Sequence, residues 1–203
     1  MSESGDAPSN VSIALVHHPV YDRNRQVVAT AITNLDLHDI ARSARTYGLF
    51  RYFVVTPIPD QRDLAARIVR HWQQGWGATY NPKRKAALEL VKIVAALDEA
   101  LSDLQQAYGR PAIIVTTGAR HQPGSVTFRR MTELMADRSQ PFLLIFGTGW
   151  GLTEEVSDRA DLVLEPVKGV GGYNHLSVRS AAAIIMDRLF GVHETVDIDA
   201  KRG

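Results

Sequence analysis

Short apolar segments alternate with longer amphipathic segments along most of this chain. The apolar segments are mostly continuous runs rich in Val, Ile, Leu and Phe, which is typical of strands covered on both faces of a parallel sheet. They predict strands over residues 12–18, 51–56, 91–95, 111–117, 141–147 and 161–167.

The intervening segments carry apolar residues at helical spacing. In "LDEALSDLQQAYG", for example, Leu97, Leu101, Leu104 and Tyr108 fall on one helical face, and Gly109 is expected to end the helix. Strict alternation of strand and helix predicts an α/β fold with a mostly parallel sheet and helices on both faces. The predicted helices cover residues 36–48, 60–75, 97–109, 125–138, 152–160 and 175–191.

Composition and length favour one ordinary globular domain. The chain has 203 residues, 45% of them hydrophobic and 22% charged, with no internal repeat and no linker. We therefore expect a flexible leader over residues 1–10, a single domain over 11–192 and a C-terminal tail over 193–203. The polar, acidic leader resembles neither a signal peptide nor a transit peptide.

The same composition excludes several classes of function. No run approaches the roughly 18 apolar residues of a membrane span, so we expect no membrane partner. The absence of cysteine excludes disulfides and thiolate metal sites, and it suits a cytoplasmic location. A formal charge of +1 gives no general attraction for nucleic acid, so RNA binding would require a local basic patch.

Three consecutive predicted strands end in glycine-rich loops, "TTGARHQPGS", "GTGWG" and "EPVKGVGGYNHLS". Ligands of open parallel sheets bind beyond the carboxyl ends of strands. Gly147 and Gly149 between strand and helix, with Glu165 about 20 residues on, allow an NAD-binding Rossmann site. Against it stand the G-x-G-x-G spacing, the bulky Trp150 and the late position of the loop. A tight turn alone, or a main-chain cradle for a neutral ring such as adenine, also fits the glycines.

A family resemblance narrows these alternatives. The segments "ITNLDLHDIARSARTYG", "LLIFGTGWGL" and "LVLEPVKGVGGYNHLSVRSAAAIIMDRL" resemble the SPOUT, or α/β-knot, RNA methyltransferases over about residues 12–190. The resemblance implies a deep C-terminal trefoil knot, S-adenosylmethionine as the cofactor and a homodimer with its active site at or near the interface. Periodicity alone does not suggest a knot, because knots are rare exceptions to ordinary topology.

The resemblance also implies roles for individual residues. Arg42, from the first long helix, corresponds to an arginine that enters the partner's active site, and Asn174 to a catalytic residue. Asp36 stands where the ribose-methylating branch usually has Asn, so the resemblance leaves ribose and base methylation both open. The implied cofactor pocket comprises Thr116, Thr117, Gly118, Phe146, Gly147, Thr148, Gly149, Leu164, Glu165, Pro166, Val167, Tyr173, Asn174, His175, Leu176 and Ser177.

RNA contacts are expected where basic and aromatic residues interleave. "RHWQQGWGATYNPKRK" has this composition, which suits looped or single-stranded RNA, although surface charge beside core tryptophans explains it equally well. We predict Arg84, Lys85 and Arg120 as RNA contacts. His17, His18 and His38 lack metal-ligand spacing, so we predict no metal.

The resulting hypothesis is a homodimeric enzyme that transfers a methyl group from S-adenosylmethionine to a nucleotide of tRNA or rRNA. Two alternatives stay open: a catalytically inactive knotted RNA-binding module, and an NAD-binding Rossmann oxidoreductase.

Overall fold

A six-stranded parallel sheet forms the centre of the protein, which we describe over residues 9–192 from a computed structural model. The strand order is β5-β4-β1-β7-β6-β8, and every pairing between neighbours is parallel, as predicted. The central strands β1 and β7 are almost entirely buried, which explains their continuous apolar sequences. The strands are β1 (Val11–Val16), β4 (Tyr52–Val55), β5 (Val91–Val94), β6 (Ile113–Thr116), β7 (Phe142–Gly147) and β8 (Leu162–Val163).

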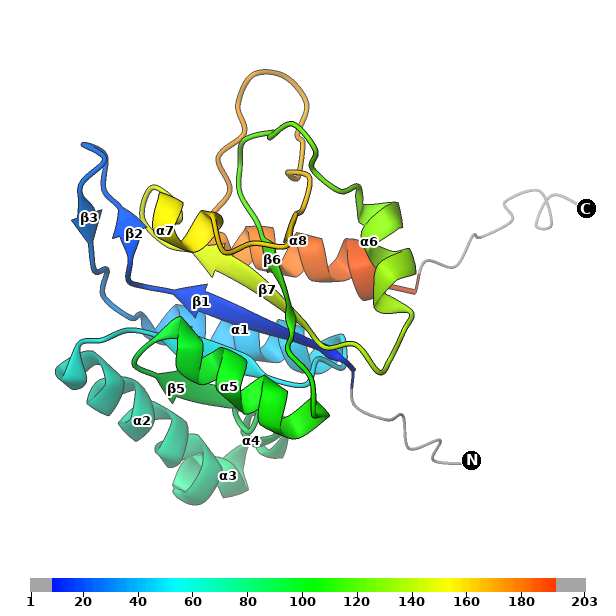
Figure 1. Cartoon of the computed structure of the whole chain (residues 1–203). Helices are drawn as coiled ribbons and strands as arrows, with labels where there is room; N and C mark the ends of the chain where they lie inside the picture. The colour runs from blue at the N-terminus through cyan, green and yellow to red at the C-terminus, as the bar shows by residue number, and fades with distance from the viewer. Residues whose placement is uncertain (1–8, 193–203) are drawn as a thin grey trace, which may run out of the picture.

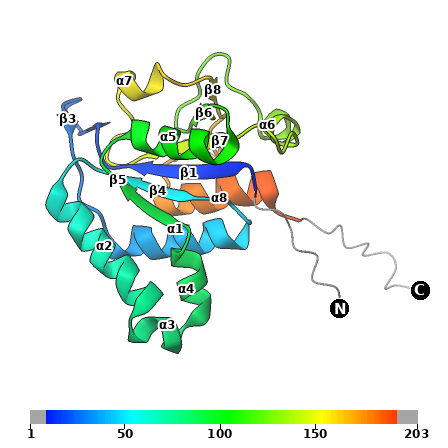
Figure 2. The same cartoon turned by 60° about the horizontal axis from the view of Figure 1, so that its bottom comes forward.

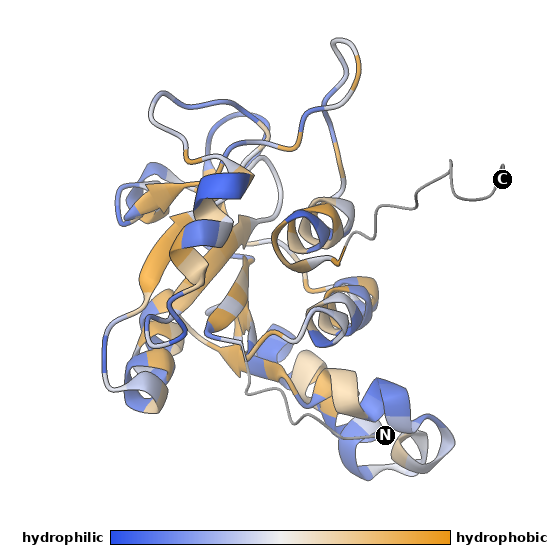
Figure 3. Cartoon of the chain, turned by 90° about the vertical axis from the view of Figure 1, so that its right-hand side faces the viewer, coloured by the Kyte–Doolittle hydropathy of each residue, from blue (hydrophilic) through white to orange (hydrophobic). Residues whose placement is uncertain are grey.

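Helices cover both faces of this sheet, as the alternation predicts (Figures 1 and 2). On one face, α1, α2 and α8 pack on residues such as Ile13, Val54 and Leu144. On the other, α5 and α7 cover Ala14 and Leu143. Figure 3 shows the hydrophobic strands between these two layers. The predicted helices are observed as α1 (Asn34–Thr46), α2 (Pro59–Gln74), α5 (Leu97–Tyr108), α6 (Phe128–Met135), α7 (Glu154–Ser157) and α8 (Val178–Phe190).

Details of the helix ends follow local sequence. Gly109 adopts φ 71° at the end of α5, which confirms the predicted stop, because a left-handed residue at this place favours glycine. The helix predicted over 152–160 is shorter, since Leu152 bridges to Val20 before α7 begins. The strand predicted over 161–167 is also shorter, because the amide of Glu165 turns away from β6 to the carbonyl of Val126.

A β-hairpin and a pair of short helices were not predicted. β2 (Val20–Tyr21) and β3 (Val27–Val28) form a small antiparallel hairpin whose turn is closed by Asp22 Oδ1, which accepts the amides of Asn24 and Gln26. Two short helices, α3 (Trp76–Tyr80) and α4 (Pro82–Leu88), follow α2. Asn81 begins α4 by accepting the amide of Arg84, and Pro82 supplies a preformed first turn.

The described chain begins inside the fold. Asn10 is buried, and its side-chain amide donates to the carbonyls of Met135, Asp137 and Gln140 at 2.8–3.2 Å. Ser9 is buried as well, so these two residues of the expected leader belong to the packed domain. The rest of that leader, and the expected tail over 193–203, lie outside the described residues.

Candidate functional site

The three predicted glycine-rich loops meet at one edge of the sheet. β7, β6 and β8 are neighbours and run parallel, so their carboxyl ends lie side by side. We call residues 117–127 the first loop, 148–153 the second loop and 164–177 the third loop. In Figure 1 the first and third loops rise together above this edge. The sequence therefore placed the three loops at one common edge correctly, and ligands of such sheets bind at this kind of edge.

The second loop is hydrogen-bonded to the β2–β3 hairpin. Trp150 donates its amide to the carbonyl of Tyr21, whose own amide donates to Gly151. Gly149 has φ +58°, and a Cβ there would meet the Tyr21 carbonyl oxygen at 2.8 Å. The glycines thus permit close approach of two backbones. Because these amides are already bonded within the protein, the loop does not form the open phosphate cradle of a Rossmann site.

Thr148 is the polar centre of the second loop. Its hydroxyl lies 2.6 Å from Thr30 Oγ1 and donates to the Val16 carbonyl, while Thr30 Oγ1 also lies 3.0 Å from Nδ1 of the buried His17. The sequence did not indicate this role of Thr30. Its position just after the hairpin, opposite the glycines, is visible only in the fold.

The third loop is bonded to the first at its start, where Glu165 donates its amide to the carbonyl of Val126, and it is open beyond that point. Asn174 Nδ2 donates to the carbonyl of Ala119 at 3.2 Å. Among the described residues, no amide from 166 to 176 donates to another backbone group, and residues 168–177 are exposed. At the end of the loop, Ser177 caps α8 by accepting the amide of Ser180. The third loop therefore offers free main-chain donors and acceptors beside a fixed helix start.

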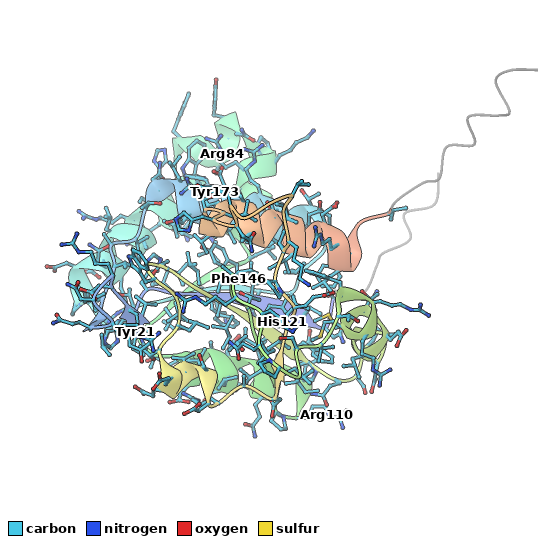
Figure 4. The ribbon with its side chains drawn as sticks, turned by 90° about the horizontal axis from the view of Figure 1, so that it is seen from above. Tyr21, Arg84, Arg110, His121, Phe146 and Tyr173 are labelled. Carbon is cyan, nitrogen blue, oxygen red and sulfur yellow. The ribbon has the colours of Figure 1, made fainter. Side chains whose placement is uncertain are left out.

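A cavity of about 270 Å³ lies between the third loop and α8. Seen from above, Tyr173 lies over α8 at this place (Figure 4). Five predicted cofactor residues line the cavity: Val167, Tyr173, Asn174, His175 and Leu176. Ile184 and Arg188, one turn apart on α8, line it too and were not predicted. The sequence signal that could have identified them is their position one turn apart on the predicted helix that follows the third loop.

The other predicted cofactor residues do not line this cavity. Phe146 and Leu164 are core side chains, so only their backbone faces the loops. Thr116 is buried, and Thr117 donates its hydroxyl to the Ile145 carbonyl. Glu165 accepts the amide of Phe128 at 2.8 Å and so stabilises the start of α6. The residues in this group are Thr116, Thr117, Gly118, Phe146, Gly147, Thr148, Gly149, Leu164, Glu165, Pro166 and Ser177.

The predicted catalytic pair is not brought together within one chain. Asn174 lines the cavity, whereas Arg42 is exposed on α1 and is absent from the cavity wall. Asp36, on the same helix as Arg42, is buried and bound by Arg179 of α8. The carboxylate that departs from the family pattern therefore has a cationic partner in this protein.

The predicted RNA contacts lie in two separate places. Arg120 is exposed in the first loop, directly after the residue that accepts from Asn174. Arg84 lies on α4, with its guanidinium 4.5 Å from the ring centre of Trp72, and Lys85 is half-buried beside it. Figure 4 shows Arg84 well apart from His121, the neighbour of Arg120.

Two histidines have environments that disfavour their charged forms. Burial lowers the pKa of His17, and the weaker influence of the Asp36 carboxylate acts in the opposite direction. Burial also lowers the pKa of His38, with further lowering by the nearby guanidinium of Arg84. Among residues 9–192, no group of three or more His, Asp or Glu side chains is arranged to hold a metal ion. No helix in the same range is long and apolar enough to cross a membrane.

Comparison with known proteins relates this site to a family. The family described as "SAM-dependent RNA methyltransferase" matches residues 10–191. A protein of Oleidesulfovibrio alaskensis named tRNA (guanine-N(1)-)-methyltransferase is 44% identical over 182 residues, which make up 90% of this chain and 42% of that protein. The chain thus spans less than half the length of this relative. An uncharacterized protein of Aquifex aeolicus is 40% identical over 181 residues, covering 89% of this chain and 88% of that one.

A solved structure confirms the fold class. The chain superposes on the SpoU methyltransferase AviRb from Streptomyces viridochromogenes, solved in complex with AdoMet, with a TM-score of 0.55 and 17% sequence identity. The match covers 91% of this chain and 58% of that one. The mostly parallel SPOUT architecture predicted from the sequence is therefore correct, while the threading of the chain through a knot stays a prediction. Together with the match over residues 10–191, this shows that the chain belongs to the SAM-dependent RNA methyltransferase family.

Proposed function

We propose that this protein is a homodimeric RNA methyltransferase that uses S-adenosylmethionine to methylate a nucleotide of tRNA or rRNA in the cytoplasm. The observation that carries the proposal is the meeting of three loops at one sheet edge, where the Asn174–Ala119 hydrogen bond closes the third loop over a cavity. The family described for residues 10–191 gives this site its chemistry.

The residues around the cavity fit the cofactor. Val167, Leu176 and Ile184 supply apolar walls for a flat ring, and the unpaired main chain of the third loop supplies hydrogen-bonding groups for its edge. At about 270 Å³ the cavity lies just below the roughly 300–1,000 Å³ of typical ligand pockets, so it suits one end of the molecule. The solved AviRb complex, which contains AdoMet, supports this assignment.

When bound, S-adenosylmethionine supplies a methyl group on a positively charged sulfur, which an oxygen or nitrogen of RNA accepts. The protein's part is to position the acceptor and to exclude water. Asn174 holds the first and third loops at a fixed separation. His175 lies beside it on the cavity wall and would take up the acceptor's proton.

Arg42 supports the proposed dimer. Its guanidinium is exposed and lies outside the cavity of its own chain, yet α1 packs directly against α8, which forms the cavity floor. A second copy of the chain would bring Arg42 to the partner's site. There it would orient a phosphate or stabilise a deprotonated hydroxyl.

The RNA substrate is proposed from the same residues. Arg120 stands in the first loop beside the cavity, where it would contact a phosphate next to the reacting nucleotide. The longer Oleidesulfovibrio relative bears the name of a tRNA guanine methyltransferase, which makes tRNA one substrate to test. The acceptor is a ribose hydroxyl or a base nitrogen, and mass spectrometry of nucleosides from cells with and without the protein distinguishes the two.

Two measurements test the proposal. Calorimetry with S-adenosylhomocysteine should show binding, whereas clear binding of NAD instead would favour an oxidoreductase. Labelled methyl groups should then enter total RNA from cells that lack the protein. Binding of cofactor and RNA with no transfer would indicate an inactive RNA-binding module. The Asp36–Arg179 pair removes one reason for that alternative, because Asp36 has a structural partner.

A further inference from the structure

Two aromatic side chains on α3 stand in solvent without covering any core. The rings of Trp76 and Tyr80 stack on each other with centroids 4.8 Å apart and planes at 19°. Trp76 is 72% exposed and Tyr80 70% exposed. Since each ring covers only one face of the other, the outer face of the pair is open. A stacked, exposed aromatic pair does nothing for the packing of this domain.

A buried contact between α3 and Trp72 holds the helix that carries this pair in place. Gly77, between the two rings in sequence, is buried against Trp72, and a Cβ there would meet the Trp72 ring at 2.7 Å. Trp72 itself makes a T-shaped contact with the His38 ring and is covered by the guanidinium of Arg84. Because α3 rests on an anchored tryptophan, Trp76 and Tyr80 are presented outward on a rigid support.

The segment of sequence that carries the pair is strongly basic, although the whole chain carries a formal charge of only +1. From Arg67 to Glu89 the sequence has five Lys and Arg residues and one acidic residue. None of these cations makes an ion pair among the described residues. Arg84 stacks on Trp72, and the charge of the other four is available. The five are Arg67, Arg70, Lys83, Arg84 and Lys85.

We infer that Trp76 and Tyr80 form a stacking platform for an unpaired base of RNA, with the surrounding cations on the adjacent phosphates. Open aromatic faces beside unpaired cations are the features that bind unstacked nucleotides, because every base has a π-face and every linkage a negative charge. The inference rests on the proposed function in naming RNA as the substrate. The inference goes beyond the proposed function because it assigns a second contact with the RNA, far from the reacting nucleotide.

The platform lies far from the site loops, and this distance predicts how its loss would change the kinetics. α3 lies at the lower end of the molecule in Figure 1, and the site loops lie at the upper end. Figures 2 and 3 show the same separation. The platform thus anchors a remote part of the RNA, so its loss should raise KM for RNA and leave kcat and cofactor binding unchanged.

The test uses fluorescence anisotropy with a labelled oligoadenylate, single-stranded or paired with oligouridylate. The double variant Trp76→Ala/Tyr80→Ala should bind the single strand at least about tenfold more weakly and the duplex unchanged. Trp76→Phe/Tyr80→Phe, which keeps both rings, should retain most of the affinity. Val27→Ala, at another exposed apolar position, should behave as wild type.

Several results would overturn the platform. They are unchanged binding of the single strand by the alanine variant, equal loss on the duplex, or no binding of either RNA by the intact protein. A lower oligomer mass with unchanged RNA affinity would assign the rings to a protein contact instead. S-adenosylhomocysteine calorimetry on the same variants reports separately on the proposed function.

Discussion

Arg179, in the first turn of α8, donates through Nη1 to the carboxylate of Asp36, in the first turn of α1, at 2.9 Å. The Asp36 side chain is only 7% exposed and also accepts the Thr33 hydroxyl. Because α8 begins directly after the third loop, this pair fixes the loop's end relative to the helix that carries Arg42. It links the two parts of the proposed active site.

We expect Arg179→Met to destabilise the protein by about 2–4 kcal/mol, because it leaves the buried Asp36 carboxylate without its cation. Asp36→Asn should cost less, about 1–2 kcal/mol, since Arg179 is partly exposed and can be solvated. Urea unfolding measures both. Asp39→Asn, at the exposed second carboxylate 3.7 Å from Arg179, is the matched control and should cost under about 0.5 kcal/mol. Equal losses in all three variants would contradict this account.

Asn174 and Arg42 should separate cofactor binding from transfer. Asn174→Ala removes the hydrogen bond that joins the exposed part of the third loop to Ala119, so we expect S-adenosylhomocysteine to bind about tenfold more weakly in calorimetry. Arg42→Ala should leave this affinity unchanged and slow methyl transfer by about 100-fold or more. Equal loss of cofactor binding in both variants would show that Arg42 has another role.

The proposed exchange of Arg42 between subunits can be tested by mixing these two variants. If Arg42 acts in the partner's site, a heterodimer has one site with both residues intact. Random mixing gives about half heterodimers, so about a quarter of wild-type activity should return. The control is each variant alone, assayed at the same total protein concentration as the mixture. A mixture no more active than its components would mean that Arg42 serves its own chain or none.

Stability should fall on mild acidification. His17 and His38 have lowered pKa values in the folded protein, mainly because they are buried. Below about pH 6.5 the unfolded chain therefore binds more protons, and the free energy of unfolding decreases as the pH drops further. Urea midpoints between pH 7.5 and 5.5 should show this decrease. His17→Gln should flatten the slope, whereas His121→Gln, in an exposed loop, should not. Parallel slopes for wild type and His17→Gln would contradict the prediction.

The second loop should tolerate no side chain at Gly149. Its φ of +58° and the 2.8 Å approach of the Tyr21 carbonyl predict that Gly149→Ala costs about 1–3 kcal/mol and weakens cofactor binding. Gly118→Ala is the matched control for stability, because a Cβ there meets nothing within 4 Å. Thermal unfolding and calorimetry check both effects, and similar melting temperatures for the two variants would refute the argument.

The sequence predicted the backbone frame well, because each signal is local. Continuous apolar runs and helical spacing identified all six strands of the main sheet and six of the eight helices within residues 9–192. It missed the hairpin and the pair α3 and α4, whose signals are single turns rather than periodic patterns. The sequence predicted the segment that contains α3 only as a basic and aromatic stretch suited to RNA.

What the sequence determined by itself is the edge at which the three loops gather, since glycine-rich loops after three neighbouring parallel strands meet once the sheet forms. Only the tertiary structure decided what each side chain does there. It turned Glu165 toward the start of α6, joined Asn174 to Ala119, and gave Asp36 a partner 143 residues away. These contacts join residues remote in sequence. No local propensity encodes them, because each depends on how helices pack across the whole sheet.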